Sequence, residues 1–205
     1  MSLPDPCVED VVAVSAMVGR PLAGRFAVVV RRRDGRPAVI ENEPHLRDGT
    51  PMPTLYWLVD PQLRAAVSRL ESEGGVHRFE SEVDEQALDR THEAYARRRD
   101  AAIVRGDLVA PRGGVGGTRR GVKCLHAHLA NYLVGAEDPV GRRVADDLAE
   151  AGEVIDDLVI DDLVIVDRVT GNSVTGNSVT GNPVTGDLVT GDLVTDPQGR
   201  EGTRG

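Results

Sequence analysis

The C-terminal part of the chain is a five-residue repeat, and this repeat limits where a compact fold can form. Eight consecutive pentads run from Asp157 to Asp196, each beginning with Asp or Asn and each with valine at its third position. A period of five matches neither the 3.6 residues of a helical turn nor the alternation of a strand, so successive valines do not share a face. The pattern is typical of disordered, low-complexity sequence, and we expect the fold to precede it.

The negative charge of the chain is concentrated in the same part. Of the 205 residues, which carry a formal net charge of −9, residues 1–135 hold 19 Lys+Arg against 18 Asp+Glu, whereas residues 136–205 hold 5 against 15. We therefore predict one domain over residues 5–150 and an acidic, disordered tail over residues 151–205. Nucleic-acid binding is not expected, because the basic run Arg31–Arg33 has no base-stacking aromatic residues near it.

The sequence predicts a cytoplasmic protein. Its two cysteines, Cys7 and Cys124, are too few for a disulfide framework, and no apolar run follows a basic N-terminal start. No stretch approaches the roughly 20 apolar residues that a membrane span needs. We therefore expect neither a membrane span nor secretion.

Three β-strands are predicted in the first third of the chain. The apolar runs Arg25–Arg32 and Pro37–Glu41 flank Asp34-Gly35, a dipeptide that favours a tight hairpin turn. The segment Thr54–Val59 (TLYWLV) gathers most of the scarce aromatic residues and is typical of a buried strand. These runs indicate a small antiparallel sheet of about three strands.

Helices are predicted from apolar spacing and from capping residues. Asp5-Pro6 and Asp60-Pro61 each combine a capping carboxylate with proline at the first helical position. In the first helix, Val8, Val11, Val12 and Val18 are expected to line the buried side. The helices are expected at residues 6–18, 61–73, 84–103, 122–134 and 140–151. The fold class is therefore α+β, with the sheet packed against three to five helices.

The segment Arg112–His128 (RGGVGGTRRGVKCLHAH) concentrates glycines and cations and contains the only lysine of the chain. Such a loop can expose backbone N–H groups and positive charge to an anion, and the N-terminus of a following helix reinforces that field. Neither a Walker A loop nor a Rossmann fingerprint is present. A flexible, solvated loop is the alternative. The predicted anion-binding residues are Arg112, Gly113, Gly114, Gly116, Gly117, Arg119, Arg120, Gly121 and Lys123.

A metal or thiol site is a second hypothesis for this region. Cys124, His126, His128 and His92 offer the ligand atoms that zinc prefers, and zinc is the one cofactor that the sequence suggests. On a regular helix Cys124 and His126 point about 200° apart, so both reach one ion only if the helix begins after Cys124. Cys124 and His128 share a face. The alternatives are a hydrogen-bonded core histidine at 126 and a thiolate at Cys124 favoured by nearby cations.

Several separated motifs together resemble one bacterial family. DGTPMPTLYWLVDPQLRAAVSRLESEGGV (48–76), THEAYARRRD (91–100), GGVGGTRRGVKCLHAHLA (113–130) and DPVG (138–141) are similar to the family called domain of unknown function 501, over most of residues 10–145. The resemblance implies no activity. Members commonly carry a cysteine where this chain has Arg32. In many members the gene stands near those for a septum-formation initiator and an exopolyphosphatase-like enzyme, which implies an envelope, division or polyphosphate context.

These observations lead to one functional expectation and two alternatives. We expect an accessory protein that binds a phosphate-bearing small molecule, or a protein partner, through residues 112–128. The first alternative is a metal-assisted or thiol-dependent enzyme acting on a phosphorylated substrate, which requires a base within reach of a nucleophile. The second is a scaffold for division proteins, which requires an exposed apolar patch.

Overall fold

The structure is a computed structural model, and it describes residues 3–153, 155 and 157–160. Within these residues it contains six α-helices and four β-strands, so the predicted α+β class is confirmed with one helix and one strand more than expected. The predicted disorder of the repeat concerns mainly residues 161–205, which lie outside the described residues.

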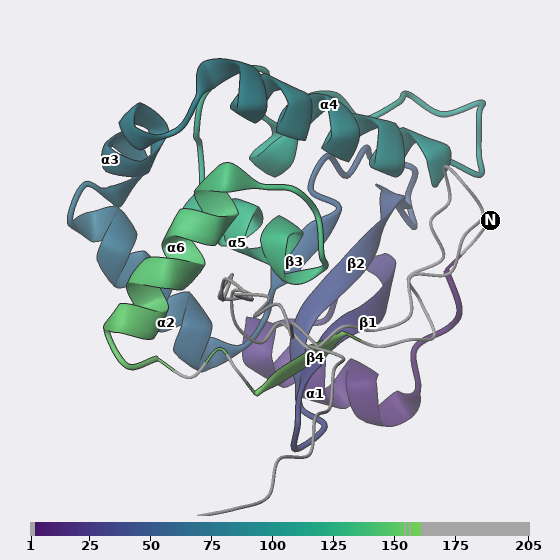
Figure 1. Cartoon of the computed structure of the whole chain (residues 1–205). Helices are drawn as coiled ribbons and strands as arrows, with labels where there is room; N and C mark the ends of the chain where they lie inside the picture. Colours follow the sequence, from purple (N-terminus) through teal and green to yellow (C-terminus); the bar gives the residue numbers. More distant parts are fainter. Residues whose placement is uncertain (1–2, 154, 156, 161–205) are drawn as a thin grey trace, which may run out of the picture.

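The sheet has four antiparallel strands in the order β3-β2-β1-β4 (Figure 1). The strands β1 (Gly24–Arg32) and β2 (Pro37–Leu46) form the hairpin that Asp34-Gly35 predicts, and β3 (Tyr56–Leu58) pairs with the other edge of β2. Short β4 (Leu158–Ile160) pairs with β1. The three expected strands are thus present in the expected order.

Both faces of the sheet are covered, which explains the continuous apolar runs in its strands. Val28 and Ile40 pack with Val14 of α1 (Val8–Val18), whereas their neighbours Val29 and Val39 belong to the larger core under the other helices. Because successive side chains of a strand point to opposite faces, a strand buried on both sides needs apolar residues at every position. The molecule therefore has α1 on one side of the sheet and the remaining helices on the other.

The predicted buried side of α1 is wrong for three of its four valines. Val8 and Val12 are 74% and 63% exposed and Val11 is 41% exposed, whereas Val14 is fully buried. The second half of the helix supplies its apolar contacts, where Met17 and Val18 pack beside Val14, whereas Asp10 in the first half accepts two hydrogen bonds from Arg31 of β1. The first half of α1 consequently presents apolar side chains to solvent.

Five helices form the layer on the other side of the sheet: α2 (Pro61–Ser72), α3 (Gly75–Glu82), α4 (Glu85–Ala101), α5 (Leu125–Leu133) and α6 (Pro139–Glu150). The carboxylates of Asp60, Asp84 and Asp138 cap α2, α4 and α6 by accepting a backbone N–H three residues on. None of the helices in the described part of the chain is long and apolar enough to cross a bilayer.

Helix α3 was not predicted, because Gly74-Gly75 was interpreted only as the end of α2. Gly74 adopts a left-handed conformation (φ 84°) and lets the chain turn directly into a second helix. Gly75 lies so close to α2 that a Cβ there would be 2.5 Å from the carbonyl oxygen of Leu70. The glycine pair is thus a tight helix-to-helix corner.

Strand β4 comes from the first pentad of the repeat, which the sequence analysis assigned to the tail. Ile155 and Leu158 are buried in the main core, and the carboxylate of Asp157 lies 2.7 Å from the guanidinium of Arg32. Three residues of a pentad can still alternate between a buried and an exposed side chain, as in a strand: Leu158 is buried and Val159 is 45% exposed. The described fold therefore reaches residue 160, beyond the predicted boundary at 150.

We expect Leu158→Ala to lower the free energy of unfolding by about 2–3 kcal/mol. The leucine side chain is 3% exposed, and its removal leaves a cavity beneath the sheet edge. Val159→Ala is the matched control, since Val159 faces solvent on the same strand, and it should change stability little. Urea unfolding followed by circular dichroism measures both. Equal stability of the two variants would show that the first pentad does not belong to the folded unit.

Candidate functional site

The glycine-rich loop is held on α4 by two buried side chains. His92 accepts the N–H of Val115 at Nδ1 (3.1 Å) and donates from Nε2 to the carbonyl oxygen of Gly121 (3.1 Å). Arg99, which is 1% exposed, donates to the carbonyl oxygen of Gly113 at 2.5 Å. The loop thus has a defined conformation that α4 supports.

Several backbone N–H groups of the loop are used inside it. Gly114 donates to the carbonyl oxygen of Thr118 (2.6 Å), Gly117 donates to that of Gly114 (3.0 Å), and the short 3-10 turn η1 (Val115–Gly117) lies between them. A Cβ on Gly114 would come within 2.5 Å of the His92 ring, and Gly113 adopts φ 86° against the backbone of Gly117. Close packing and turn geometry therefore account for these glycines.

The loop cations point into solvent. Arg112, Arg119, Arg120 and Lys123 are all exposed, and none of them forms an ion pair with another described residue. The structure thus brings the predicted anion-binding residues onto one loop but uses several of their amides internally. Anion binding by this loop remains a prediction.

Two of the four predicted metal ligands are buried in the core instead. His128 is fully buried, and its Nδ1 donates to the Asp138 carboxylate, at 3.0 Å from each oxygen. The His92 and His128 rings stack edge to face with centroids 5.7 Å apart. Burial and the neighbouring His128 together lower the pKa of His92. Both ring nitrogens of His92 hold the loop, so these two histidines support the fold.

The other two ligands, Cys124 and His126, lie together because α5 begins at Leu125. Cys124 is the N-cap residue of α5, and its backbone is extended (φ −154°). The helix therefore begins after Cys124, as it must if Cys124 and His126 are to reach one ion. Its Sγ lies 3.8 Å from Nδ1 of His126, and Oε1 of Glu71 lies 3.2 Å from the same nitrogen. Burial opposes a charged imidazole, but the contacts with Cys124 and Glu71 outweigh it and raise the pKa of His126.

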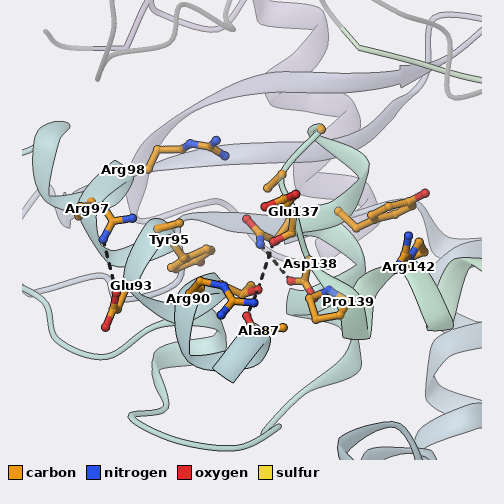
Figure 2. A pocket seen from close by; sticks show the side chains of 16 residues that line it. Ala87, Arg90, Glu93, Tyr95, Arg97, Arg98, Glu137, Asp138, Pro139 and Arg142 are labelled. Atoms are coloured by element: carbon orange, nitrogen blue, oxygen red, sulfur yellow. Dashed lines mark hydrogen bonds and ion pairs between the residues drawn. The ribbon is translucent and has the colours of Figure 1, made fainter. Parts of the chain in front are cut away.

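A cleft of about 660 Å³ lies between α4 and the α5–α6 corner (Figure 2). Figure 2 shows Arg97 and Arg98 on one side of it and Arg142 on the other, with Arg90 extending between them. Tyr132, which is partly exposed, contributes aromatic surface to the lining, whereas Tyr95 lies buried beneath it. The cleft thus combines four arginines from α4 and α6 with the aromatic ring of Tyr132.

Among the described residues, three of these arginines have no carboxylate partner. Arg97 pairs with Glu93 at 3.7 Å, and Arg98 donates to the Tyr56 hydroxyl at 3.4 Å. Arg90 and Arg142 form no ion pair with any residue that the structure describes. The exposed Glu137 is the remaining free carboxylate of the lining. The cleft therefore has positive charge that is available to a ligand.

Glu71, Arg90 and Arg142 were not predicted from the sequence as site residues. Arg90 lies seven and eight residues before Arg97 and Arg98, a helical spacing that predicts a common face and was available in the sequence. Glu71 and Arg142 carry no such signal, because each meets its partners only through the packing of separate helices. Tertiary structure was needed to find them.

A comparison with family models matches residues 28–146 to the family described as "Protein of unknown function (DUF501)". This match covers more than half of the chain and includes α2 to α5, the glycine-rich loop and most of the cleft. No curated protein and no solved structure matches the chain.

Proposed function

The chain belongs to this family of unknown function, and from the geometry we propose that it binds a phosphate-bearing anion in the cleft between α4 and α6. The observation that carries the proposal is the group of four guanidinium groups around one concavity, three of them without a carboxylate partner among the described residues. Ligand binding at a protein surface usually needs such a concavity together with a few convergent polar groups.

The chemistry of the cleft suits a small phosphorylated molecule. Guanidinium groups bind phosphate oxygens through paired N–H donors, and they remain charged at any physiological pH. A volume of about 660 Å³ lies within the range of small-molecule sites. Arg90, Arg98 and Arg142 would contact the anion, and the partly exposed Tyr132 ring would pack against its uncharged part.

The cleft is a better candidate than the glycine-rich loop. Several loop amides are committed to hydrogen bonds within the loop, and its cations Arg119, Arg120 and Lys123 do not line the cleft, whereas the four arginines converge on it. The proposal concerns binding alone.

We expect inorganic pyrophosphate and nucleotides to raise the melting temperature of the purified protein, because they bind only the folded state. Arg90→Gln and Arg142→Gln should each weaken binding about 10-fold, since each removes a charge-assisted hydrogen bond. Isothermal titration at two salt concentrations measures the affinities.

Arg143→Gln is the matched control, because Arg143 is the exposed neighbour of Arg142 and pairs with Glu82 outside the cleft. It should leave the affinity unchanged. The double variant Arg119→Gln/Arg120→Gln tests the loop. If this variant loses binding while the cleft variants keep it, the anion binds where the sequence analysis predicted.

A further inference from the structure

Three side chains with metal-ligating atoms meet where the end of α2 packs against the start of α5. Glu71 lies in the last turn of α2, Cys124 caps α5, and His126 is its second residue. One ligand atom from each residue lies within 4.8 Å of the other two, and all three residues are partly buried. The cluster lies outside the arginine-lined cleft.

The hydrogen bonds of His126 determine which ring nitrogen is free. Nε2 lies 3.1 Å from the carbonyl oxygen of Arg64, which can only accept, so Nε2 carries the proton. In the neutral ring, the lone pair of Nδ1 then faces Oε1 of Glu71 at 3.2 Å and Sγ of Cys124 at 3.8 Å. Three electron-rich atoms therefore converge on one point, and a cation or a proton is needed between them.

The two distances from Nδ1 of His126 fit a tetrahedral ion, and Sγ of Cys124 and Oε1 of Glu71 lie within 4.8 Å of each other. With Zn–N and Zn–O bonds of about 2.0–2.1 Å and a Zn–S bond of about 2.3 Å, tetrahedral angles place nitrogen and oxygen about 3.3 Å apart and sulfur and nitrogen about 3.6 Å apart. The observed separations are 3.2 Å and 3.8 Å. Little movement would be needed to bind the ion.

The outer partners of a zinc site are also in place. Oε1 of Glu71 accepts the N–H of Leu125 at 2.7 Å, which fixes the carboxylate. A metal-bound histidine usually donates its other N–H to a carbonyl or carboxylate, as His126 does to Arg64. These contacts orient two of the ligands before any ion binds.

We propose that Glu71, Cys124 and His126 bind one Zn²⁺ ion, with a fourth position open to solvent or to a ligand. The donor set of one thiolate, one imidazole and one carboxylate favours zinc over magnesium or calcium, which prefer oxygen atoms alone. The site differs from the predicted group of Cys124, His128, His92 and His126, because Glu71 replaces the two buried histidines. It is independent of the anion-binding cleft.

The experiment uses the full chain after removal of metal by a chelator. We expect one equivalent of Zn²⁺ to bind in competition with a chromophoric chelator, and Co²⁺ to give the intense visible spectrum of a tetrahedral site together with a thiolate-to-cobalt band. Cys124→Ser, His126→Gln and Glu71→Gln should each weaken Zn²⁺ binding by more than about 100-fold, since loss of a ligand exceeds the effect of losing an outer partner.

Each ligand has an exposed counterpart that serves as a matched control. Cys7→Ser, His77→Gln and Glu73→Gln remove the same side chains elsewhere and should leave the affinity unchanged. In a Cys7→Ser background, Zn²⁺ should also protect Cys124 from alkylation, a readout that does not require a ligand variant to fold. Three results would each overturn the proposal: no stoichiometric Zn²⁺ binding, a cobalt spectrum without the thiolate band, or alkylation of Cys124 that Zn²⁺ does not slow. The three side chains would then share a proton in place of a metal ion.

Discussion

Asp138→Ala is expected to lower the free energy of unfolding by about 4 kcal/mol, because one buried carboxylate holds three separate donors. It accepts from Nδ1 of His128, from the side-chain amide of Asn131 at 3.0 Å and from the N–H of Gly141 at 2.8 Å. Alanine would leave all three donors buried without a partner. It would also remove the cap of α6.

Chemical unfolding of Asp138→Ala and of the matched control Asp146→Ala tests this expectation. Asp146 is exposed on the same helix, and its removal should not measurably change stability. Asp138→Asn should fall between the two, because the amide oxygen can still cap α6 but the charge that faces His128 is lost. A stability of Asp138→Ala equal to that of the control would show that the His128 network contributes nothing to the fold.

Much of the fold could be predicted because its signals are local. Asp60-Pro61 specifies the start of α2, and the helical spacing of the apolar residues that follow specifies its buried face. In the same way, Asp34-Gly35 specifies the hairpin. Strand β4 could not be predicted in this way. Its pairing with β1 joins residues more than 120 positions apart, and the five-residue period concealed the short alternation at Leu158.

The candidate sites were predictable only in part, for the same reason. Sequence spacing set the condition under which Cys124 and His126 could meet, and the start of α5 at Leu125 fulfils it. Glu71, the third member, comes from a helix that ends more than 50 residues earlier. For the glycines of the loop the sequence offered anion binding or a flexible, solvated loop, and contacts such as that of Gly114 with the His92 ring indicate a packing role that neither interpretation included.

Removal of the buried Arg32–Asp60 ion pair is the second large effect that we expect. The Asp60 carboxylate accepts from Nε and Nη2 of Arg32 at 2.7 Å and 3.0 Å, and both side chains are almost completely buried. Asp60→Ala should cost about 3–5 kcal/mol, because it takes two hydrogen bonds from a buried guanidinium and removes the cap of α2.

The exposed pair Arg36–Asp34 offers the matched control. Its atoms are equally close, at 2.7 Å, but both side chains are more than half exposed, so Arg36→Ala, which breaks the pair and keeps the turn residue Asp34, should change stability little. Urea unfolding at neutral pH compares the two variants. Because a buried pair is costly to desolvate, the double variant Arg32→Met/Asp60→Leu should be more stable than Asp60→Ala, and failure to regain stability would contradict the assigned cause.

The same pair predicts how stability depends on pH. Burial alone would raise the pKa of Asp60, but the Arg32 hydrogen bonds and the N–H of Leu63 outweigh it and hold the pKa below the usual value. A carboxyl group whose pKa is lower in the folded state stabilises the fold above its unfolded pKa of about 3.9, and this stabilisation is lost as the pH falls through the folded value. The wild-type protein should therefore lose stability below about pH 4, and Asp60→Asn, which cannot titrate, should show a shallower decline in the same range. Parallel slopes for the two proteins would mean that other carboxylates govern acid unfolding.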